Sequence, residues 1–267
     1  MASLFNSVER DGIALHWRSD GPEDGAPVLF ANSLGTDMRV WDPLLPYLPA
    51  GLRVIRFDKP GHGLSGTRAG AYRIHDLVAD AAAVLNAAEV REASVVGLSI
   101  GGMIAQGLAA EAPERVRALA LLDTGAKIGT PEMWAERIAA LRADGLESMA
   151  DAIMERWFSA TFRAAEPSVG LWRTMVTRTQ IEGYIGCCEA IAAADLTVGT
   201  RAILKPALCV VGTADGSTPP ETVKALADLI PGATYAEIEG VGHIPCVEAP
   251  ERLAAHLSPF LKEHCGV

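Results

Sequence analysis

The sequence predicts an α/β fold in which a mostly parallel sheet is covered by helices on both faces. Short apolar segments that suit buried strands alternate with helical segments along most of the 267 residues. Continuous apolar strands between helices are typical of parallel sheets that are buried on both sides. In addition, a G-x-S-x-G motif at residues 97–101 stands between such a strand and such a helix, where a sharp turn would expose Ser99 at the end of the sheet.

The first half of the chain begins with an expected antiparallel hairpin. Residues 13–18 alternate apolar and polar side chains, which is typical of a half-buried strand, and we expect them to pair with residues 4–8. A short helix is expected over 38–48, broken by Pro43 and Pro46. The other expected elements are strands at 28–30, 53–58 and 93–96 and helices at 77–88 and 102–110.

The second half contains a strand at 116–122 and then a long, mostly helical stretch over 131–195. The alternation resumes with strands at 208–212 and 233–238 and closes with a helix over 250–264. Because the segment from 125 to 200 has no clear strand, we interpret it as a helical cap above the carboxyl ends of the strands, where open α/β sheets keep their sites. The expected division is a core of residues 1–124 and 201–267 and a helical cap of residues 125–200.

Composition agrees with a globular protein and argues against two classes of partner. Hydrophobic residues make up 49% of the chain and charged residues 21%, which suits a domain with a sizeable core. The net charge is −10 and there is no run of Lys or Arg, so nucleic-acid binding is disfavoured. No apolar stretch reaches the roughly 18–20 residues of a membrane span, and residues 1–10 lack the pattern of a secretory signal. We therefore expect a cytoplasmic protein that binds neither membranes nor nucleic acid.

The five cysteines predict neither a disulfide framework nor a zinc site. Their number is odd and no C-x-x-C spacing occurs. Cys187 and Cys188 are adjacent, and Cys209 lies inside an expected strand. These features favour reduced cysteines. The sequence offers no evident site for a metal or an organic cofactor, and we expect none.

Three residues in chain order predict a catalytic relay. Ser99 stands on the turn, Asp215 lies just past the strand at 208–212, and His243 follows the strand at 233–238. In such a relay the histidine takes the serine proton and returns it to the leaving group, while the aspartate orients the histidine. Taken singly, Asp215 suits a turn and His243 a loop. The order Ser, Asp, His, with each residue at a strand end, favours a hydrolytic site.

Two backbone amides are candidates for an oxyanion hole. In a serine hydrolase of this layout one N–H group comes from the residue after the nucleophile and the other from the loop after an early strand. These are Ile100 and Leu34, the latter within the N-S-L-G stretch at residues 32–35. A His-Gly pair usually begins this loop, whereas Asn32 and Ser33 stand here. The alternative is an ordinary turn made by Asn, Ser and Gly.

Two further residues compete for catalytic roles. His62 lies in the Gly- and Pro-rich stretch D-K-P-G-H-G-L-S at residues 58–65. It precedes the nucleophile in the chain, and we interpret it as structural. Asp123 follows the strand at 116–122 and is the rival of Asp215 for the role of the acid.

The whole chain resembles enzymes of the α/β-hydrolase fold, and within them the 3-oxoadipate enol-lactonases of aromatic catabolism. The general resemblance rests on the serine turn, the loop at 58–65, the helical insertion and the late Asp and His. The closer resemblance rests on distinctive stretches: N-S-L-G-T-D at 32–37 with Trp41 and Asp42, G-L-S-I-G-G at 97–102, L-D-T-G-A-K-I-G-T at 122–130 leading to W-A-E-R at 134–137, G-Y-I-G-C-C at 183–188, and residues 193–195.

The resemblance implies an α/β-hydrolase fold and the opening of an enol-lactone that carries a carboxymethyl arm. Ser99 would attack the lactone carbonyl with help from His243, and the amides of Leu34 and Ile100 would hold the oxyanion. An acyl-enzyme would form and water would release a dicarboxylate in the β-ketoadipate pathway. The implied partner is a small carboxylated lactone, and the oligomeric state stays open.

Trp134 and Arg137 are the candidates for substrate recognition. Three residues apart, they would share one face of the first cap helix. An arginine offers a planar fork that suits a carboxylate, and an indole can pack on a lactone ring. A surface Arg paired with Glu, and a Trp that fills the seam between cap and core, is the structural alternative. The resemblance favours the functional interpretation.

Two other functions stay open at this point. One is a different hydrolase on the same scaffold, such as a carboxylesterase, a C–C bond hydrolase or a cofactor-free perhydrolase. The other is a ligand-binding or signalling relative in which turnover is incidental. Activity on a panel of substrates distinguishes the first alternative from an enol-lactonase. A measured turnover rate distinguishes the second alternative from an enzyme.

Overall fold

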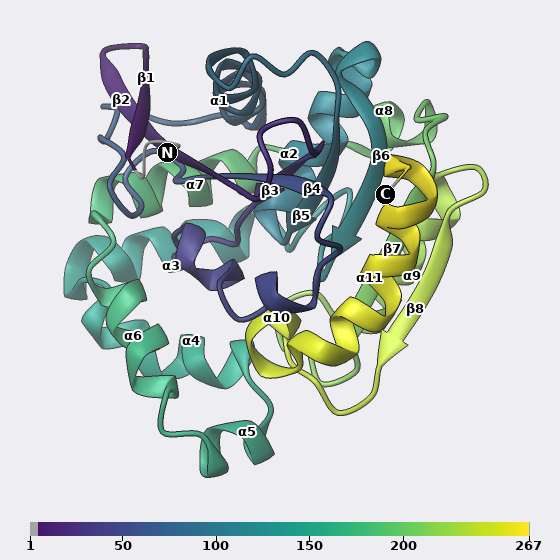
Figure 1. The fold of residues 1–267 in the computed structure, drawn as a ribbon. Coiled ribbons are helices and arrows are strands. Elements are labelled where there is room, and N and C mark those ends of the chain that lie inside the picture. The colour runs from purple at the N-terminus through teal and green to yellow at the C-terminus, as the bar shows by residue number, and fades with distance from the viewer. Residues whose placement is uncertain (1–4, 267) are drawn as a thin grey trace.

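The computed structural model describes residues 5–266 and contains one eight-stranded sheet between layers of helices (Figure 1). The strands lie in the order β1-β2-β4-β3-β5-β6-β7-β8. From β4 through β8 all pairings are parallel, so the predicted α/β class with a mostly parallel sheet is confirmed. The strands are β1 (Asn6–Arg10), β2 (Ile13–Asp20), β3 (Ala26–Ala31), β4 (Leu52–Phe57), β5 (Ala93–Leu98), β6 (Val116–Leu122), β7 (Ala207–Gly212) and β8 (Thr234–Ile238).

The expected hairpin at the start of the chain is present. β1 pairs antiparallel with β2, with Val8 opposite Leu15, and β2 pairs antiparallel with β4. Residue 4, where we expected the first strand to begin, lies outside the described residues. The hairpin therefore extends the parallel sheet at one edge.

The middle strands are the most deeply buried part of the sheet. Every residue of β5 and of β7 is buried, as the continuous apolar runs in the sequence predict. The chain passes from β3 to β4 on one side and then returns to β5 on the other side of β3. Such a reversal opens a crevice at the carboxyl ends of the two strands, where ligands of open α/β sheets bind.

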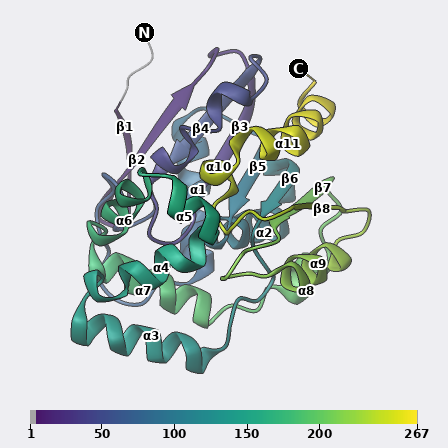
Figure 2. The same ribbon diagram turned by 90° about the horizontal axis from the view of Figure 1, so that it is seen from below.

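Helices cover both faces of the sheet (Figure 2). The helices α1 (Ile74–Ala87), α2 (Ile100–Glu111), α8 (Thr197–Arg201) and α9 (Pro220–Leu229) lie on one face, and α10 (Pro245–Glu248) and α11 (Pro250–Cys265) on the other. The single helix expected over 38–48 is replaced by two 3₁₀ turns, η1 (Met38–Trp41) and η2 (Leu45–Tyr47). Pro43 and Pro46 lack the amide hydrogens that a continuous α-helix requires.

The long helical insertion gathers at one end of the sheet. Between β6 and β7 the chain forms α3 (Pro131–Asp144), η4 (Glu147–Met149), α4 (Ala150–Trp157), α5 (Ala160–Ala165), α6 (Val169–Thr177) and α7 (Ile181–Ala192) (Figures 1 and 2). As expected, residues 125–200 contain no strand. The 3₁₀ turn η3 (Pro113–Arg115) precedes β6. No helix among residues 5–266 is both long and apolar enough to cross a membrane.

Candidate active site

Ser99 stands on a strained turn between β5 and α2. Its φ and ψ angles are 57° and −121°, a backbone conformation that residues other than glycine rarely adopt. The flanking glycines are required by space. A Cβ atom at Gly97 would lie 2.3 Å from the carbonyl oxygen of Gly101, and one at Gly101 would lie 1.9 Å from the carbonyl oxygen of Ala31. The G-x-S-x-G motif therefore allows β3, β5 and α2 to meet closely and leaves Ser99 at the end of the sheet.

Asp215 and His243 form a buried hydrogen-bonded pair. His243 Nδ1 lies 2.8 Å from Asp215 Oδ2, and both side chains are at most 2% exposed. The aspartate lies after β7 and the histidine after β8, so neighbouring parallel strands bring together two residues that are 28 positions apart. This hydrogen bond engages Nδ1 of the imidazole and leaves Nε2 available to Ser99 or to water.

Asp215 is held in its charged form by several donors. Burial alone would raise its pKa, but the charge of His243 and hydrogen bonds from His243, Thr218 and Ser217 lower the pKa of this carboxyl below its ordinary value. The amides of Ser217 and Thr218 donate to Oδ1 over 2.6 and 3.1 Å, and the Thr218 hydroxyl donates to Oδ2 over 2.7 Å. An ionised Asp215 is what an acid that stabilises an imidazolium requires.

Asp123, the rival acid, lies next to this pair but in a different electrostatic state. It is fully buried, and its Oδ1 accepts a 2.9 Å hydrogen bond from the Gly212 amide. Burial, followed by the negative charge of Asp215, raises its pKa well above the ordinary value. The shift favours the neutral form of Asp123, and Asp215 is the residue that hydrogen-bonds to His243.

The same three side chains also form a group of potential metal ligands. One ligand atom from each of Asp123, Asp215 and His243 lies within 4.8 Å of the others. However, the direct 2.8 Å contact between His243 Nδ1 and Asp215 Oδ2 leaves no space for an ion between those atoms. The donor set suits a hydrogen-bonded relay better than a metal centre. All five cysteines are free and buried.

The two candidate oxyanion amides make no hydrogen bond within the described chain. Within residues 5–266, neither the Leu34 nor the Ile100 N–H group donates to another atom of the chain. Ile100 is the first residue of α2, where helix amides are unpaired and favour negative charge. Leu34 lies in the loop after β3 and lines the same pocket as Ser99. Both amides are therefore free to donate to an anion.

His62 supports this loop rather than facing the nucleophile. Its Nε2 accepts a 3.0 Å hydrogen bond from the Gly35 amide, and its Nδ1 lies 2.9 Å from the Pro60 carbonyl oxygen. Burial, followed by the charge of Lys59, lowers the pKa of His62 well below its ordinary value. A neutral histidine with its proton on Nδ1 satisfies both contacts, which agrees with the structural interpretation of His62.

A single pocket contains Ser99 and His243 and reaches under the helical insertion. Its volume is about 210 Å³, smaller than the roughly 300–1,000 Å³ of pockets for drug-sized ligands. It is lined by Ser33, Leu34, Ser99, Ile128, Gly129, Met133, Trp134, Arg137, Met149, Arg156, Trp157, Tyr184, Ile191, Gly216, Ser217, Thr218 and His243. The pocket suits a small substrate whose reacting carbonyl faces Ser99.

Trp134 and Arg137 both line this pocket. Trp134 is buried, and its indole nitrogen donates to the Ile128 carbonyl oxygen over 2.7 Å. The Arg137 guanidinium lies 5.4 Å from the centre of the Trp134 ring and 5.7 Å from that of Tyr184, and it donates to the Tyr184 hydroxyl over 2.5 Å. Among residues 5–266 no acidic side chain forms an ion pair with Arg137.

Arg156, at the end of α4, is a pocket residue that sequence reasoning missed. Its Nη2 atom is buried, and no hydrogen-bond partner for it occurs in the described part of the chain. Burial, followed by the positive charge of Arg137, lowers the pKa of Arg156, so the two guanidinium groups are close enough to repel. Nothing in the local sequence distinguishes Arg156 from the other charged residues of the insertion, and only the packing of α4 over the strand ends turns it toward the pocket.

Comparisons with known proteins give the same architecture. Residues 26–250 match the model of a family described as the alpha/beta hydrolase fold. The chain is 34% identical to 3-oxoadipate enol-lactonase 2 from Acinetobacter baylyi over 92% of both sequences. It is 35% identical to an enol-lactonase of known structure from Burkholderia xenovorans, with a TM-score of 0.93 over 96% of this chain and 100% of that one.

The relatives are not confined to lactonases. A non-heme chloroperoxidase from Streptomyces lividans is 29% identical over 94% of this chain and 97% of its own length. The family match covers most of the chain, and the two enol-lactonase relatives exceed 30% identity. The chain therefore belongs to the alpha/beta hydrolase fold family, and it is a hydrolase.

Proposed function

We propose that this α/β-hydrolase opens 3-oxoadipate enol-lactone to 3-oxoadipate through an acyl-enzyme on Ser99. Relatives at 34% and 35% identity that are named as enol-lactonases support the substrate class. The observation that carries the proposal is the pair of arginines, Arg137 and Arg156, in the pocket of Ser99 and His243. We take the substrate to be a small lactone with a carboxylate arm.

The charges of the pocket support an anionic substrate. The chain carries a net charge of −10, which weakly repels a carboxylate at long range. Two guanidinium groups without an acidic partner in the described chain oppose this repulsion locally. An arginine fork binds a carboxylate with two parallel hydrogen bonds. A neutral ester would leave the buried Nη2 atom of Arg156 without a hydrogen-bond partner in the described chain, which is unfavourable for a buried polar group.

In the first half of the proposed reaction, Ser99 attacks the lactone carbonyl. His243 Nε2 accepts the proton of the Ser99 hydroxyl, and Asp215 stabilises the imidazolium that results. The Leu34 and Ile100 amides donate to the carbonyl oxygen as it gains negative charge. The ring C–O bond then breaks, His243 returns the proton, and the enol end of the opened chain becomes a ketone by tautomerisation.

In the second half of the reaction, water replaces the Ser99 hydroxyl as the nucleophile. His243 takes a proton from water, the hydroxide attacks the acyl ester, and Ser99 leaves with the proton that His243 returns. The same two amides stabilise the second tetrahedral intermediate. Throughout, Arg137 and Arg156 would hold the carboxylate arm, and Trp134 would pack against the ring and exclude water.

The experiment that tests this function compares kcat/KM on 3-oxoadipate enol-lactone with kcat/KM on p-nitrophenyl acetate. We expect a preference for the lactone of at least about 10²-fold, because each of the two arginines would add a charge-assisted hydrogen bond of ~1.5–3 kcal/mol and each 1.4 kcal/mol is tenfold. Equal values on the two substrates would contradict the lactone assignment and favour a general esterase. Negligible turnover of both would favour the ligand-binding alternative.

A perhydrolase is the second candidate, and the chloroperoxidase relative supports it. In that reaction hydrogen peroxide replaces water in the attack on the acyl-enzyme, and the same relay serves. Formation of peracid from acetate and hydrogen peroxide tests this candidate directly. A peracid rate that exceeds the lactone rate would make perhydrolysis the main activity.

A further inference from the structure

A buried lysine contacts the loop that carries one of the candidate oxyanion amides. Lys59 is 0% exposed, and its Nζ atom donates to the carbonyl oxygens of Ser33 over 2.9 Å and of Asn32 over 3.1 Å, with a longer contact of 3.4 Å to that of Thr36. The catalytic steps described above do not use this group. A buried ammonium held only by carbonyl groups requires an explanation, because burial of a charge is unfavourable.

The Ser33 carbonyl and the Leu34 amide are the two ends of one peptide group. Electron delocalisation links the carbonyl oxygen to the N–H hydrogen, and a hydrogen bond at one end strengthens the donor at the other. The Ser33 oxygen accepts from Lys59 and also from the hydroxyl and the amide of Thr36, over 2.8 and 3.2 Å. This peptide group is therefore polarised by three donors, one of them charged.

We propose that Lys59 is a positioning residue for the oxyanion hole, whose ammonium group orients the Ser33–Leu34 peptide and strengthens the Leu34 N–H as a donor. The oxygen that becomes negative in the transition state would bind to a donor backed by a full positive charge. The inference rests on the part of the proposed function that assigns the Leu34 amide to the oxyanion. It does not depend on which ester or lactone is the substrate.

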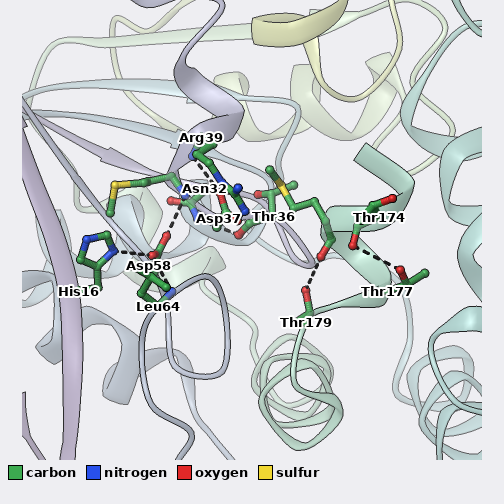
Figure 3. A network of polar contacts seen from close by, with 12 residues as sticks. His16, Asn32, Thr36, Asp37, Arg39, Asp58, Leu64, Thr174, Thr177 and Thr179 are labelled. Carbon is green, nitrogen blue, oxygen red and sulfur yellow. Dashed lines mark hydrogen bonds and ion pairs between the residues drawn. The ribbon is translucent and has the colours of Figure 1, made fainter. Parts of the chain in front are cut away.

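In the described chain Lys59 has no direct acidic partner, although the charges of Asp58 and Asp37 raise its pKa against the effect of burial. The nearby titratable groups are Asp37 and Asp58 on the neighbouring loops, Cys187 on α7, and His62. Asp37 is paired with Arg39, and Asp58 with His16 (Figure 3). Burial raises the pKa of the Cys187 thiol to about 12, so this group is neutral. In residues 5–266 no acidic side chain forms an ion pair with Lys59.

The loop is also fixed from its other side, so the direction of the Leu34 amide is set. The Asn32 side-chain amide donates to the Thr36 carbonyl oxygen over 2.8 Å (Figure 3), and the Gly35 amide donates to His62. The loop of residues 32–36 therefore has internal and external hydrogen bonds around the unpaired Leu34 N–H group. Lys59 adds the only charged donor among these contacts in the described chain.

Substitution of Lys59 tests the inference on p-nitrophenyl acetate. We expect Lys59→Met and Lys59→Gln to lower kcat by about 10- to 100-fold, less than the 10²–10³ that follows loss of a whole oxyanion donor. KM should stay within about twofold, because the interaction strengthens only in the transition state. The exposed Lys262→Met is the matched control and should retain wild-type kcat.

A spectroscopic measurement separates polarisation from a merely structural role. The infrared stretching frequency of the acyl-enzyme carbonyl falls as its hydrogen bonds strengthen, so Lys59→Met should shift this band to higher wavenumber. An unchanged band and an unchanged kcat in a folded variant would overturn the inference. A wild-type enzyme that turns over the ester but not the lactone would overturn the lactone assignment alone.

The pH dependence of the wild-type enzyme gives a test that needs no folded variant. Burial lowers the pKa of Lys59 to about 8, so kcat on the ester should fall as pH rises through 8. Between about pH 8 and pH 10.5 the unfolded chain still binds a proton on Lys59 that the folded chain has lost. Lys59 therefore makes the folded state more stable as the pH rises through this range. Loss of activity without loss of folding supports the inference. A kcat that is flat from pH 7 to pH 10 overturns it.

Discussion

The loops at the strand ends and the helices of the insertion hold their polar side chains in different ways. At the strand ends the charged side chains of Asp215 and Lys59 have several protein partners: Asp215 accepts four hydrogen bonds, including that of His243, and Lys59 donates to three carbonyl groups. In the insertion, Arg137 rests between two aromatic rings and Arg156 keeps a buried nitrogen without a partner in the described chain.

This difference separates chemistry from recognition. The Asp215–His243 pair and the loop that carries the Leu34 amide are held in place by hydrogen bonds within the protein, and the Leu34 and Ile100 amides are left free for an anion. Such fixed groups meet the condition for electrostatic preorganisation. The arginines of the insertion, Arg137 and Arg156, have no acidic partner in the described chain until an anionic substrate binds. Substitutions at the strand ends should therefore change kcat, whereas substitutions in the insertion should change KM for charged substrates.

The largest expected effect is at Ser99. Ser99→Ala should fold normally and lose hydrolysis of lactone and ester alike by about 10³-fold or more, because only binding and the oxyanion hole remain. Single-turnover assays of highly purified protein, with circular dichroism as the check on folding, measure this loss. Activity close to that of the wild type would remove Ser99 as the nucleophile.

The next effect separates the two buried acids. Asp215→Asn should lower kcat by about 10²–10⁴-fold, since His243 loses its charged acceptor. Asp123→Asn should have a much smaller effect, because the asparagine retains the oxygen that accepts from the Gly212 amide. Steady-state kinetics of both variants provide the comparison. A greater loss in a folded Asp123→Asn variant would reverse the assignment of the acid.

A smaller and more selective effect is expected in the insertion. Arg137→Ala and Arg156→Ala should each raise KM for the carboxylated lactone by about 10- to 100-fold, since a hydrogen bond to a charged group contributes ~1.5–3 kcal/mol. Hydrolysis of p-nitrophenyl acetate should barely change. Arg142→Ala, at an exposed position of the same helix α3 that pairs with Glu189, is the control. Equal effects on both substrates would mean that the arginines support the helices rather than bind the carboxylate.

The smallest effect concerns folding stability. The pKa of Asp123 is raised in the folded state, so its contribution is complete below its unfolded pKa of about 3.9 and is lost as pH rises through the folded value. Asp123→Asn has no such titration and should reduce the loss of stability with rising pH. Urea unfolding at several pH values between 4 and 8 measures the slope. Identical slopes for variant and wild type would indicate that Asp123 is ionised in the folded protein.

The sheet was largely predictable from the sequence because its strands are continuous apolar runs. β6 has the predicted bounds, and the insertion lacks strands as expected. Element ends were less predictable. Helix α1 begins at Ile74 rather than at 77, because the Asp76 side chain accepts from the Arg73 amide and caps an earlier turn. Local polar contacts of this kind do not appear in the hydrophobic pattern.

The candidate site divides in the same way. Ser99, Asp215, His243, Leu34 and Ile100 follow strands or begin a helix, so their convergence could be predicted from chain order, and their roles stay predictions. Arg156 and Lys59 could not be identified in advance. Arg156 reaches the pocket only because α4 packs over the strand ends, and Lys59 matters only because its amine meets the carbonyl oxygens of a loop 23 to 27 residues away.

The two arginines without an acidic partner also have a consequence for the end of the catalytic cycle. Under the proposed reaction the lactone enters with one carboxylate, and hydrolysis of the ring ester creates a second one in the same pocket. The pair Arg137 and Arg156 therefore faces more negative charge after the reaction than before it. Retention of the dicarboxylate should make product release slow and product inhibition strong, and small dicarboxylates should raise the melting temperature of the protein.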